Sequence, residues 1–440
     1  MAITRRDALL AGLFGGGALG LRSLVSGLPP GLLIDPLLPR VAHASSGFLA
    51  RTLIVSSSSE GDPINGNVPG TYGPGLEDVK HPADPRLAET AFEHNGAPAV
   101  AAKPWAELPT SILDRMSFFH HATYTNSHPN HSKSMRLQGA VRNNEMLFSA
   151  LAAETAPALI TTQTEPVSLG ADGGELISFR GRKLSNVSPT GLSAALSQGS
   201  DAELARLRDD TVDELYDLYR ERGTKKHIAL LDTFARTRRE AREVNASLLD
   251  RLGDIDNQDR VTAQITAAGV LTAMNLAPVI TIEIPFGRDN HADPGLYQEI
   301  TETLSGVDYL ERLLSEIAGL QAEGVIRQEV VFATMNVFGR TLSLKRKGLN
   351  GRDHNAQHHC MIIHGDGVRG GTVGGLEQKG GDWGAAPIDS STGAVSQRGD
   401  VPFAETYQAA AKTLGAALGV GETELDDMID GGRIVRAALQ

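Results

Sequence analysis

The sequence predicts an α/β fold built around a mostly parallel β-sheet. Short apolar runs rich in β-branched residues are typical of buried strands, and polar clusters follow them. Longer segments with apolar residues at three- and four-residue spacing separate the later runs and are typical of helices. This strand–helix–strand alternation favours parallel strands covered by helices. The composition, 41% hydrophobic and 21% charged over 440 residues, is ordinary for a globular protein.

The first 44 residues predict an export leader rather than a part of the fold. Arg5 and Arg6 form a twin-arginine pattern before an apolar stretch, and Ala42–Ala44 supplies a small-x-small cleavage site. Glycines dilute the apolar stretch and Arg22 ends it short of a bilayer span, which argues against an uncleaved anchor. An ordinary secretory signal is the alternative. We therefore expect a periplasmic or extracellular protein with no membrane span after cleavage.

Two strands are expected in the first half of the remaining chain, at 51–55 and 116–120. Asp62 lies in a turn after the first strand, where it is a candidate ligand or a residue of ordinary turn chemistry. A helix over 132–153 is expected after the second strand, and its positive N-terminus would suit an anionic group. The candidate caps of that helix are Asn126, Ser127 and Asn130.

The rest of the chain alternates helices and strands. Residues 200–255 carry two charged amphipathic helices without a chemical motif, which we interpret as a helical insertion packed on the sheet. Residues 376–400 are predicted to form a Gly/Ser-rich loop. The remaining elements are helices over 259–274 and 297–322, strands over 278–284, 330–333 and 360–363, and closing helices over 404–418 and 425–439.

Histidine and aspartate side chains gather at the ends of these strands. Eight of the 13 histidines fall in two short windows of the sequence. Asp289 with His291, and Asp353 with His354, lie in loops beside strand ends. Carboxylate oxygen and neutral imidazole nitrogen both bind zinc-like divalent ions, so these windows predict a metal site. The alternative is a solvated loop with histidines at turn positions.

Charge and cysteine content exclude other classes of function. A formal net charge of −12 argues against a nucleic-acid surface. The single cysteine, Cys360, excludes an intrachain disulfide, and its apolar neighbours predict a small buried hydrophobic residue. We expect no organic cofactor.

Three motifs occur in order along the chain: GRDNH at 287–291, FGRT at 338–341 and GRDH at 351–354, with GDGVRGG following at 365–371. This set resembles the twin-arginine-exported bacterial family called domain of unknown function 1501, within the alkaline-phosphatase-like superfamily. The corresponding runs in that family are usually GWDTH, SEFGRT, GRDH and GxGxKGG. The resemblance implies a three-layer α/β/α alkaline-phosphatase-like domain over residues 45–440. It places metal ligands at Asp62, Asp289, His291, Asp353 and His354.

The resemblance also implies the catalytic groups. Either Ser127 with His128 or Asn130 with His131 occupies the region of the superfamily nucleophile, because the sequence NHSKSM resembles the family's SHFRSM. For Ser127 a simple helix cap is the alternative, and for Arg340 a structural role is the alternative to binding an anion. The candidate guanidinium groups for clamping an anionic substrate are those of Arg288, Arg340 and Arg352.

One departure from the family pattern bears on the function. Val337 stands where the family has a carboxylate, so a ligand for a second cation is missing and one ion or none is expected. The implied activity is metal-assisted hydrolysis of a small phosphate or sulfate ester. The alternative is a non-enzymatic exported binding or envelope protein with a degenerate metal site.

Overall fold

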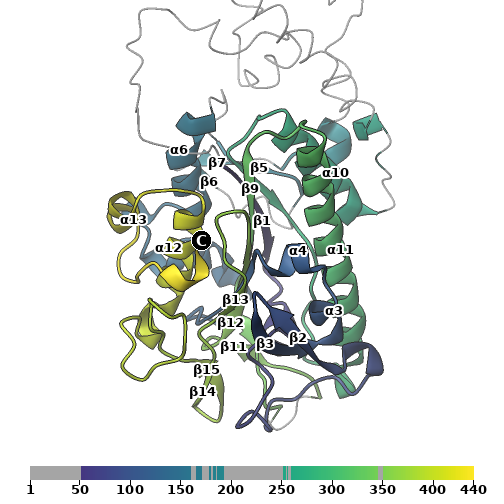
Figure 1. Ribbon diagram of the computed structural model, residues 1–440, viewed down its shortest axis with the longest axis vertical. Helices are drawn as coiled ribbons and strands as arrows, with labels where there is room; N and C mark the ends of the chain where they lie inside the picture. The colour runs from purple at the N-terminus through teal and green to yellow at the C-terminus, as the bar shows by residue number, and fades with distance from the viewer. Residues whose placement is uncertain are drawn as a thin grey trace, which may run out of the picture.

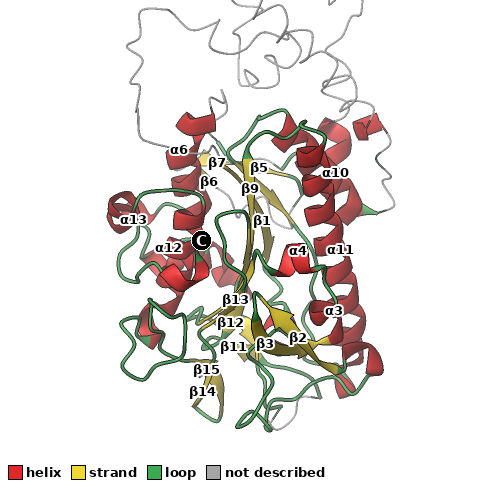
Figure 2. Ribbon diagram, viewed as in Figure 1, coloured by secondary structure: helices red, strands yellow, loops and turns green. Residues whose placement is uncertain are grey.

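Figure 1 shows a computed structural model of the chain, which describes residues 51–159, 165–170, 178–179, 182–184, 186–192, 251–253, 255, 259–344 and 350–440. The expected leader and nearly all of the expected insertion over 200–255 lie outside the described residues. The described part is a central sheet with helices on both faces (Figure 2).

A seven-stranded sheet forms the centre of the fold. β1 pairs in parallel with β8 and β9, whereas β12 is antiparallel to both β9 and β4. β5 and β13 run parallel to their neighbours, so only β12 opposes the rest and the expected mostly parallel sheet is confirmed. The carboxyl ends of β1, β4, β8 and β9 therefore meet at one edge, together with the amino end of β12. The strands in spatial order are β13 (Gly371–Val373), β4 (Met116–His121), β12 (His359–His364), β9 (Glu329–Asn336), β1 (Arg51–Ser58), β8 (Val279–Ile282) and β5 (Val167–Ser168).

Alternation along β1 divides the apolar core between the two faces of the sheet. Ile54 belongs to the cluster that includes α10 (Arg260–Ala273) and α11 (Tyr297–Ala322). Its neighbours Leu53 and Val55 belong to the cluster that includes α6 (Leu147–Leu159) and α12 (Thr406–Ala417). Successive strand residues point to opposite faces, so a strand buried on both faces has the continuous apolar sequence seen here.

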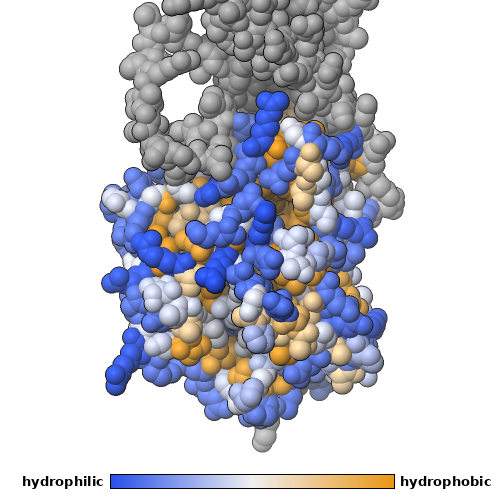
Figure 3. Space-filling model, viewed as in Figure 1, coloured by the Kyte–Doolittle hydropathy of each residue, from blue (hydrophilic) through white to orange (hydrophobic). Residues whose placement is uncertain are grey.

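The helical layers leave little apolar surface exposed. Among the described residues, the exposed large hydrophobic side chains are those of Tyr297 and Val395. On the face shown in Figure 3, hydrophobic residues are interrupted by hydrophilic ones. None of the described helices has the length and apolarity needed to cross a bilayer.

The expected helices α10 and α11 are confirmed. Asp259 caps α10, because its carboxylate accepts hydrogen bonds from the N–H groups of Val261 at 3.1 Å and Thr262 at 3.0 Å. The smaller elements are the hairpins β2 (Glu89–His94) with β3 (Ala97–Ala102) and β6 (Ser178–Phe179) with β7 (Arg182–Lys183), the pair β10 (Gly339–Arg340) with β11 (His354–Asn355), and the short helices α3 (Lys103–Ala106), α4 (Thr110–Leu113), α5 (His131–Ser134) and α13 (Glu422–Met428).

Three sequence predictions are wrong. The single helix expected over 132–153 is divided into α5 and α6, because Leu137, Gln138, Asn143 and Asn144 have positive φ and turn the chain between them. The closing helix expected over 425–439 is replaced by α13 and a later 3-10 turn (Arg436–Ala438). The segment 376–400 is not entirely loop, since it contains the hairpin of β14 (Leu376–Lys379) and β15 (Asp382–Ala385).

A fully buried ion pair ties the loops at the carboxyl edge of the sheet to α11. Arg352 donates to both oxygens of the Glu299 carboxylate, at 2.6 and 3.0 Å, and neither side chain is exposed. The carboxylate also accepts from the side-chain amides of Asn67 at 2.8 Å and Asn290 at 3.0 Å. Two further Arg352 N–H groups bind the carbonyls of Thr341 and Lys80. Each guanidinium nitrogen and each carboxylate oxygen of the pair thus has a partner, which burial of charge requires.

Close backbone contacts explain two glycines of the motifs. A Cβ on Gly351 would collide with the carbonyl oxygen of Asn290, and one on Gly339 would collide with that of His358. These contacts hold the GRDH and FGRT segments against their neighbours, so both positions require glycine.

Replacing Glu299 by Gln tests the buried pair. We expect Glu299→Gln to lower the free energy of unfolding by about 3–5 kcal/mol, because it leaves the Arg352 charge buried and unpaired. Asp308→Asn is the matched control, since Asp308 forms an exposed pair with Arg312 on the same helix and should cost at most about 1 kcal/mol. Urea unfolding of both variants measures the difference. Equal, small losses would contradict the assigned role of the pair.

Candidate metal centre

Five side chains from three segments meet at the edge of the sheet where β1, β4, β8 and β9 end. His128 begins a 3-10 turn (η4, His128–Asn130) that follows β4. Asp289 and His291 lie in the loop after β8, and Asp353 and His354 lie at the start of β11. β11 is labelled at the lower end of the sheet in Figure 1.

The five residues form two overlapping groups that share His354. The ligand atoms of His128, Asp289 and His354 lie within 4.8 Å of one another, and so do those of His291, Asp353 and His354. The Nε2 atoms of His291 and His354 are 2.9 Å apart, and His291 Nε2 is 3.4 Å from Asp289 Oδ1. Two nitrogen ligands of one zinc ion lie about 2.9 Å apart at a right angle and about 3.3 Å apart at a tetrahedral angle. The spacing therefore fits ligands of a single ion.

Hydrogen bonds determine which ring nitrogen of two histidines faces the cluster. His354 Nδ1 donates to the carbonyl oxygen of Asn126 at 2.6 Å, and His128 Nδ1 donates to that of Ser59 at 2.7 Å. A carbonyl oxygen only accepts, so the proton of each neutral ring is on Nδ1 and the lone pair is on Nε2. Metal-binding histidines are commonly oriented in this way, by a carbonyl bound to the second ring nitrogen.

Burial sets the protonation of the cluster. Desolvation lowers the pKa of His354 to about 4 and also lowers the pKa of His291. Partial burial alone would raise the pKa of Asp289, but the His291 N–H and the charge of Arg340 outweigh it, and the pKa is lowered. At neutral pH His291 and His354 are therefore neutral and Asp289 is ionised, which are the states that bind a divalent cation.

Arg340 supports the centre from within the protein. Its side chain is fully buried, Nε donates to the carbonyl of Gly61 at 2.5 Å, and Nη2 donates to that of Glu60 at 2.6 Å. Nη1 pairs with Asp289 Oδ1 at 3.3 Å. The guanidinium is thus fully engaged, which favours the structural role over the binding of an anion. Arg352 is engaged by Glu299, so among the three candidate arginines only Arg288 is exposed.

Phe338 forms an apolar wall of the centre and was not among the predicted site residues. Its ring stacks on that of His354 with centroids 4.1 Å apart and meets the His128 ring edge-on at 4.9 Å. It also lies so close to Gly61 that any Cβ there would overlap it. The phenylalanine of the FGRT motif was visible in the sequence, but nothing local indicated which residues it would contact.

Two predicted catalytic residues lie near the centre without joining either group. Ser127 directly precedes His128, and its hydroxyl does not cap η4. His131 points into the core, where its Nε2 lies 2.9 Å from Ser57 Oγ and burial lowers its pKa to about 3. The expected anion site at a helix N-terminus is also missing here, because α5 has only four residues.

Asp62, a predicted ligand, belongs to neither group. It is almost fully buried, accepts from Ser58 Oγ at 2.8 Å and lies 3.4 Å from the backbone nitrogen of Phe286. Desolvation raises its pKa to about 8 against these hydrogen bonds, so the carboxyl group is mostly neutral at pH 7. Val337, where the resemblance leads us to expect a carboxylate, is fully buried and apolar.

Two further histidines of the predicted windows, His120 and His358, form a buried chain of hydrogen bonds. His120 Nε2 donates to the carbonyl of Pro69 at 2.8 Å, so its Nδ1 accepts from His358 Nε2 at 2.8 Å. His358 Nδ1 in turn accepts from the side-chain amide of Asn65 at 3.1 Å. Desolvation lowers the pKa of both rings, and all four ring nitrogens are satisfied in neutral form. The same Asn65 amide donates to the carbonyl of Arg340, which links this chain of hydrogen bonds to β10.

Comparison of the chain with protein-family models finds no match, and comparison with curated proteins finds none either. The case for a function therefore depends on the geometry of the centre.

The raised pKa of Asp62 predicts a specific dependence of stability on pH. The folded protein binds the Asp62 proton more tightly than the unfolded chain does. This proton binding contributes fully to the free energy of unfolding below the ordinary pKa of 3.8, and the contribution is lost as pH rises from there through about 8. We expect Asp62→Asn to gain stability relative to the unmodified protein by up to about 1.4 kcal/mol per pH unit over that window. Urea unfolding of both proteins across the window measures it. Parallel pH profiles would show that Asp62 is already ionised in the folded protein.

Proposed function

We propose that the chain binds one zinc-like divalent ion through His354 together with residues of the two groups around it. The observation that carries the proposal is the position of His354, which belongs to both groups and has Nε2 available because the Asn126 carbonyl accepts from Nδ1. The mixture of imidazole nitrogen and carboxylate oxygen suits zinc-like ions. Partial exposure of His128, His291 and His354 leaves the centre accessible to a ligand from solvent.

The charges favour one ion rather than two. Asp289 and Asp353 are the two carboxylates of the cluster, and together they balance one divalent cation. Asp62 is held mostly neutral, and Val337 contributes no charge. A second divalent ion would have no further carboxylate in either group and would lie near the Arg340 guanidinium, which raises its cost.

We infer that the centre hydrolyses a small phosphate or sulfate ester, in keeping with the resemblance to the alkaline-phosphatase-like family. A bound divalent ion supplies Lewis acidity and lowers the pKa of a bound water. Arg340 orients Asp289, the Asn126 and Ser59 carbonyls orient His354 and His128, and Phe338 keeps water from one side of the rings. Ser127 and a water molecule are both candidates for the nucleophile. The expected leader would place this activity in the periplasm or outside the cell.

A specific observation favours the alternative, a binding or envelope protein with a metal site that has lost catalysis. The buried guanidinium groups of Arg340 and Arg352 are both engaged by protein groups, and the family carboxylate is replaced by Val337. Among the candidate arginines, an anionic substrate would then meet the exposed Arg288 beside the bound ion.

Metal binding should depend most strongly on His354. We expect His354→Ala to lower zinc affinity by more than the roughly 10–100-fold typical of losing a group that only orients a ligand, because it removes a ligand from both groups. Competition with a chromophoric chelator and elemental analysis measure affinity and stoichiometry. His364→Ala, at the opposite end of β12, is the control and should bind zinc normally. Comparison of Asp289→Asn with Asp353→Asn then shows which group holds the ion. Folded protein that takes up no ion would overturn the proposal.

Ester hydrolysis requires a separate measurement. We expect the zinc-loaded protein to release nitrophenol from p-nitrophenyl phosphate or p-nitrophenyl sulfate, and to lose this activity with a chelator or with His354→Ala. Ser127→Ala distinguishes the two nucleophiles, since only a serine nucleophile makes turnover depend on this hydroxyl. A protein with one ion bound and no turnover of either ester would favour the binding protein.

A further inference from the structure

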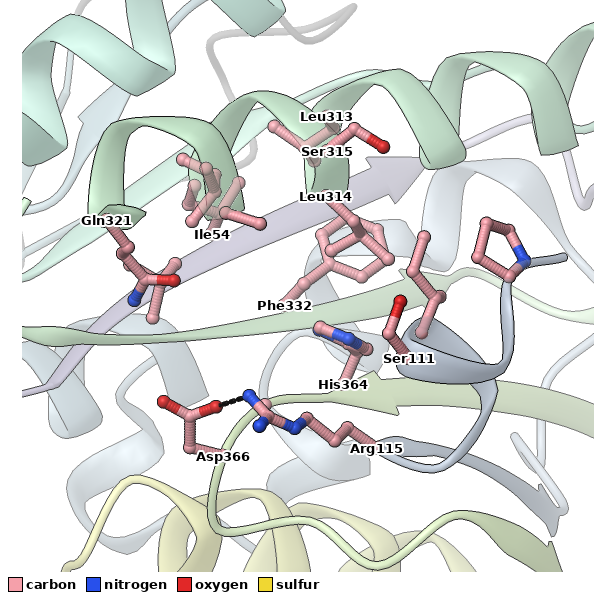
Figure 4. A pocket seen from close by; sticks show the side chains of 16 residues that line it. Ile54, Ser111, Arg115, Leu313, Leu314, Ser315, Gln321, Phe332, His364 and Asp366 are labelled. Carbon is pink, nitrogen blue, oxygen red and sulfur yellow. Dashed lines mark hydrogen bonds and ion pairs between the residues drawn. The ribbon is translucent and has the colours of Figure 1, made fainter. Parts of the chain in front are cut away.

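A cavity of about 240 Å³ (Figure 4) lies on the face of the sheet that α10 and α11 cover. It is bounded by α11 on one side and by α4 and the end of β12 on the other. β12 runs from the metal-centre edge at His359 to the cavity at His364. Five steps of roughly 3.3 Å place these two ends about 16 Å apart. The cavity is therefore a site of its own.

The floor and one wall of the cavity are apolar. Ile54 and Phe332, from the central strands β1 and β9, form the floor, and Leu313, Leu314 and Ile317 of α11 form the wall. These side chains are almost completely buried in the apolar cluster of this face. An apolar group that enters the cavity would be transferred from water to this apolar surface, and the burial would favour its binding.

Polar groups converge at the other end of the cavity. Figure 4 shows the His364 ring between Phe332 and Arg115, with the Arg115 guanidinium reaching Asp366. Among the described residues, the His364 side chain has no hydrogen-bond partner, and Arg115 uses only Nη1, which pairs with Asp366 Oδ1. Burial and then the charge of Arg115 lower the pKa of His364 to about 4, so the ring is neutral and carries one N–H donor.

We propose that this cavity binds a small amphipathic carboxylate, with its hydrocarbon part against the α11 wall and its carboxylate at Arg115 and His364. The Nε and Nη2 groups of Arg115 lie on the edge of the guanidinium that Asp366 does not use. This edge matches the two oxygens of a carboxylate. An alcohol would form no charge-assisted bond, and the carboxylate that an amine would need at this end is that of Asp366, which Arg115 already engages.

The volume limits the size of the ligand. At about 30 Å³ for each water-sized group, the cavity holds about eight such groups. This is below the roughly 300–1,000 Å³ of sites for drug-sized molecules. A straight-chain acid such as hexanoate, or a monocyclic acid of similar size, fits this limit.

Calorimetric titration with hexanoate, 1-hexanol and hexylamine tests the proposal on the full chain. We expect hexanoate to bind at one site and 1-hexanol to bind at least about tenfold more weakly, since it lacks the charge-assisted bonds. Arg115→Gln should weaken hexanoate about tenfold and leave 1-hexanol unchanged. Leu314→Phe, which fills the cavity, should weaken both ligands. Arg142→Gln is the control, because Arg142 is as exposed as Arg115 and also pairs with an aspartate.

A carboxylate is also a ligand for metal ions, so the titration is repeated with a chelator present and with His354→Ala. Binding that persists under both conditions and is weakened by Arg115→Gln supports the cavity as the site. Absence of saturable binding would overturn the proposal. Equal affinity for acid and alcohol, no effect of Arg115→Gln, or loss of binding with the chelator would also do so.

Discussion

The buried pair of Arg352 and Glu299 is the interaction on which the candidate metal centre depends. An ion pair removed from water is tolerated only when its other polar groups are also satisfied. Here they are satisfied by loops, through the side chains of Asn67 and Asn290 and the carbonyl of Thr341. Asn290 lies between Asp289 and His291, and Arg352 immediately precedes Asp353. The pair therefore fixes in one step the backbone from which four of the five side chains project.

The buried guanidinium of Arg340 also holds backbone and a side chain of the centre in place. Arg340 binds two successive carbonyls of the turn after β1 and one oxygen of Asp289. Lysine would not replace either arginine, because a planar group with five donors can bind several acceptors in fixed directions and an ammonium cannot. The arginines of the FGRT and GRDH motifs thus hold backbone segments in place, and neither is available to bind an anion.

Much of the fold was predictable, because β-branched runs and amphipathic helices such as 297–322 have strong local signals. The approach of Asp289 and His291 to Asp353 and His354 was also predictable, since parallel strands end at one edge. The opposite direction of β12 was not foreseen, although the lack of a helix between β9 and β12 was a signal for it. The burial of His131 and Asp62 was not predictable, because the sequence of a turn does not show whether a side chain points to the sheet edge or into the core. The division of the helix over 132–153 depends on positive φ angles at ordinary residues such as Leu137 and Asn143, and Gly139, which also has a positive φ, was the one local signal for it.

The electrostatics of the centre follow from what surrounds it. With Asp62 held mostly neutral by burial and Val337 in the core, its ionisable ligands are confined to the two groups around His354. Because burial also lowers the pKa of His354, its nitrogen is available to a cation without competition from protons near neutral pH. The two carboxylates of the groups balance the charge of one divalent ion, and the buried Arg340 beside Asp289 disfavours a second ion. In the proposed function, the bound ion and the exposed guanidinium of Arg288 would be the positive charges that the described residues offer to an anionic substrate, because the buried guanidinium groups are engaged by the protein.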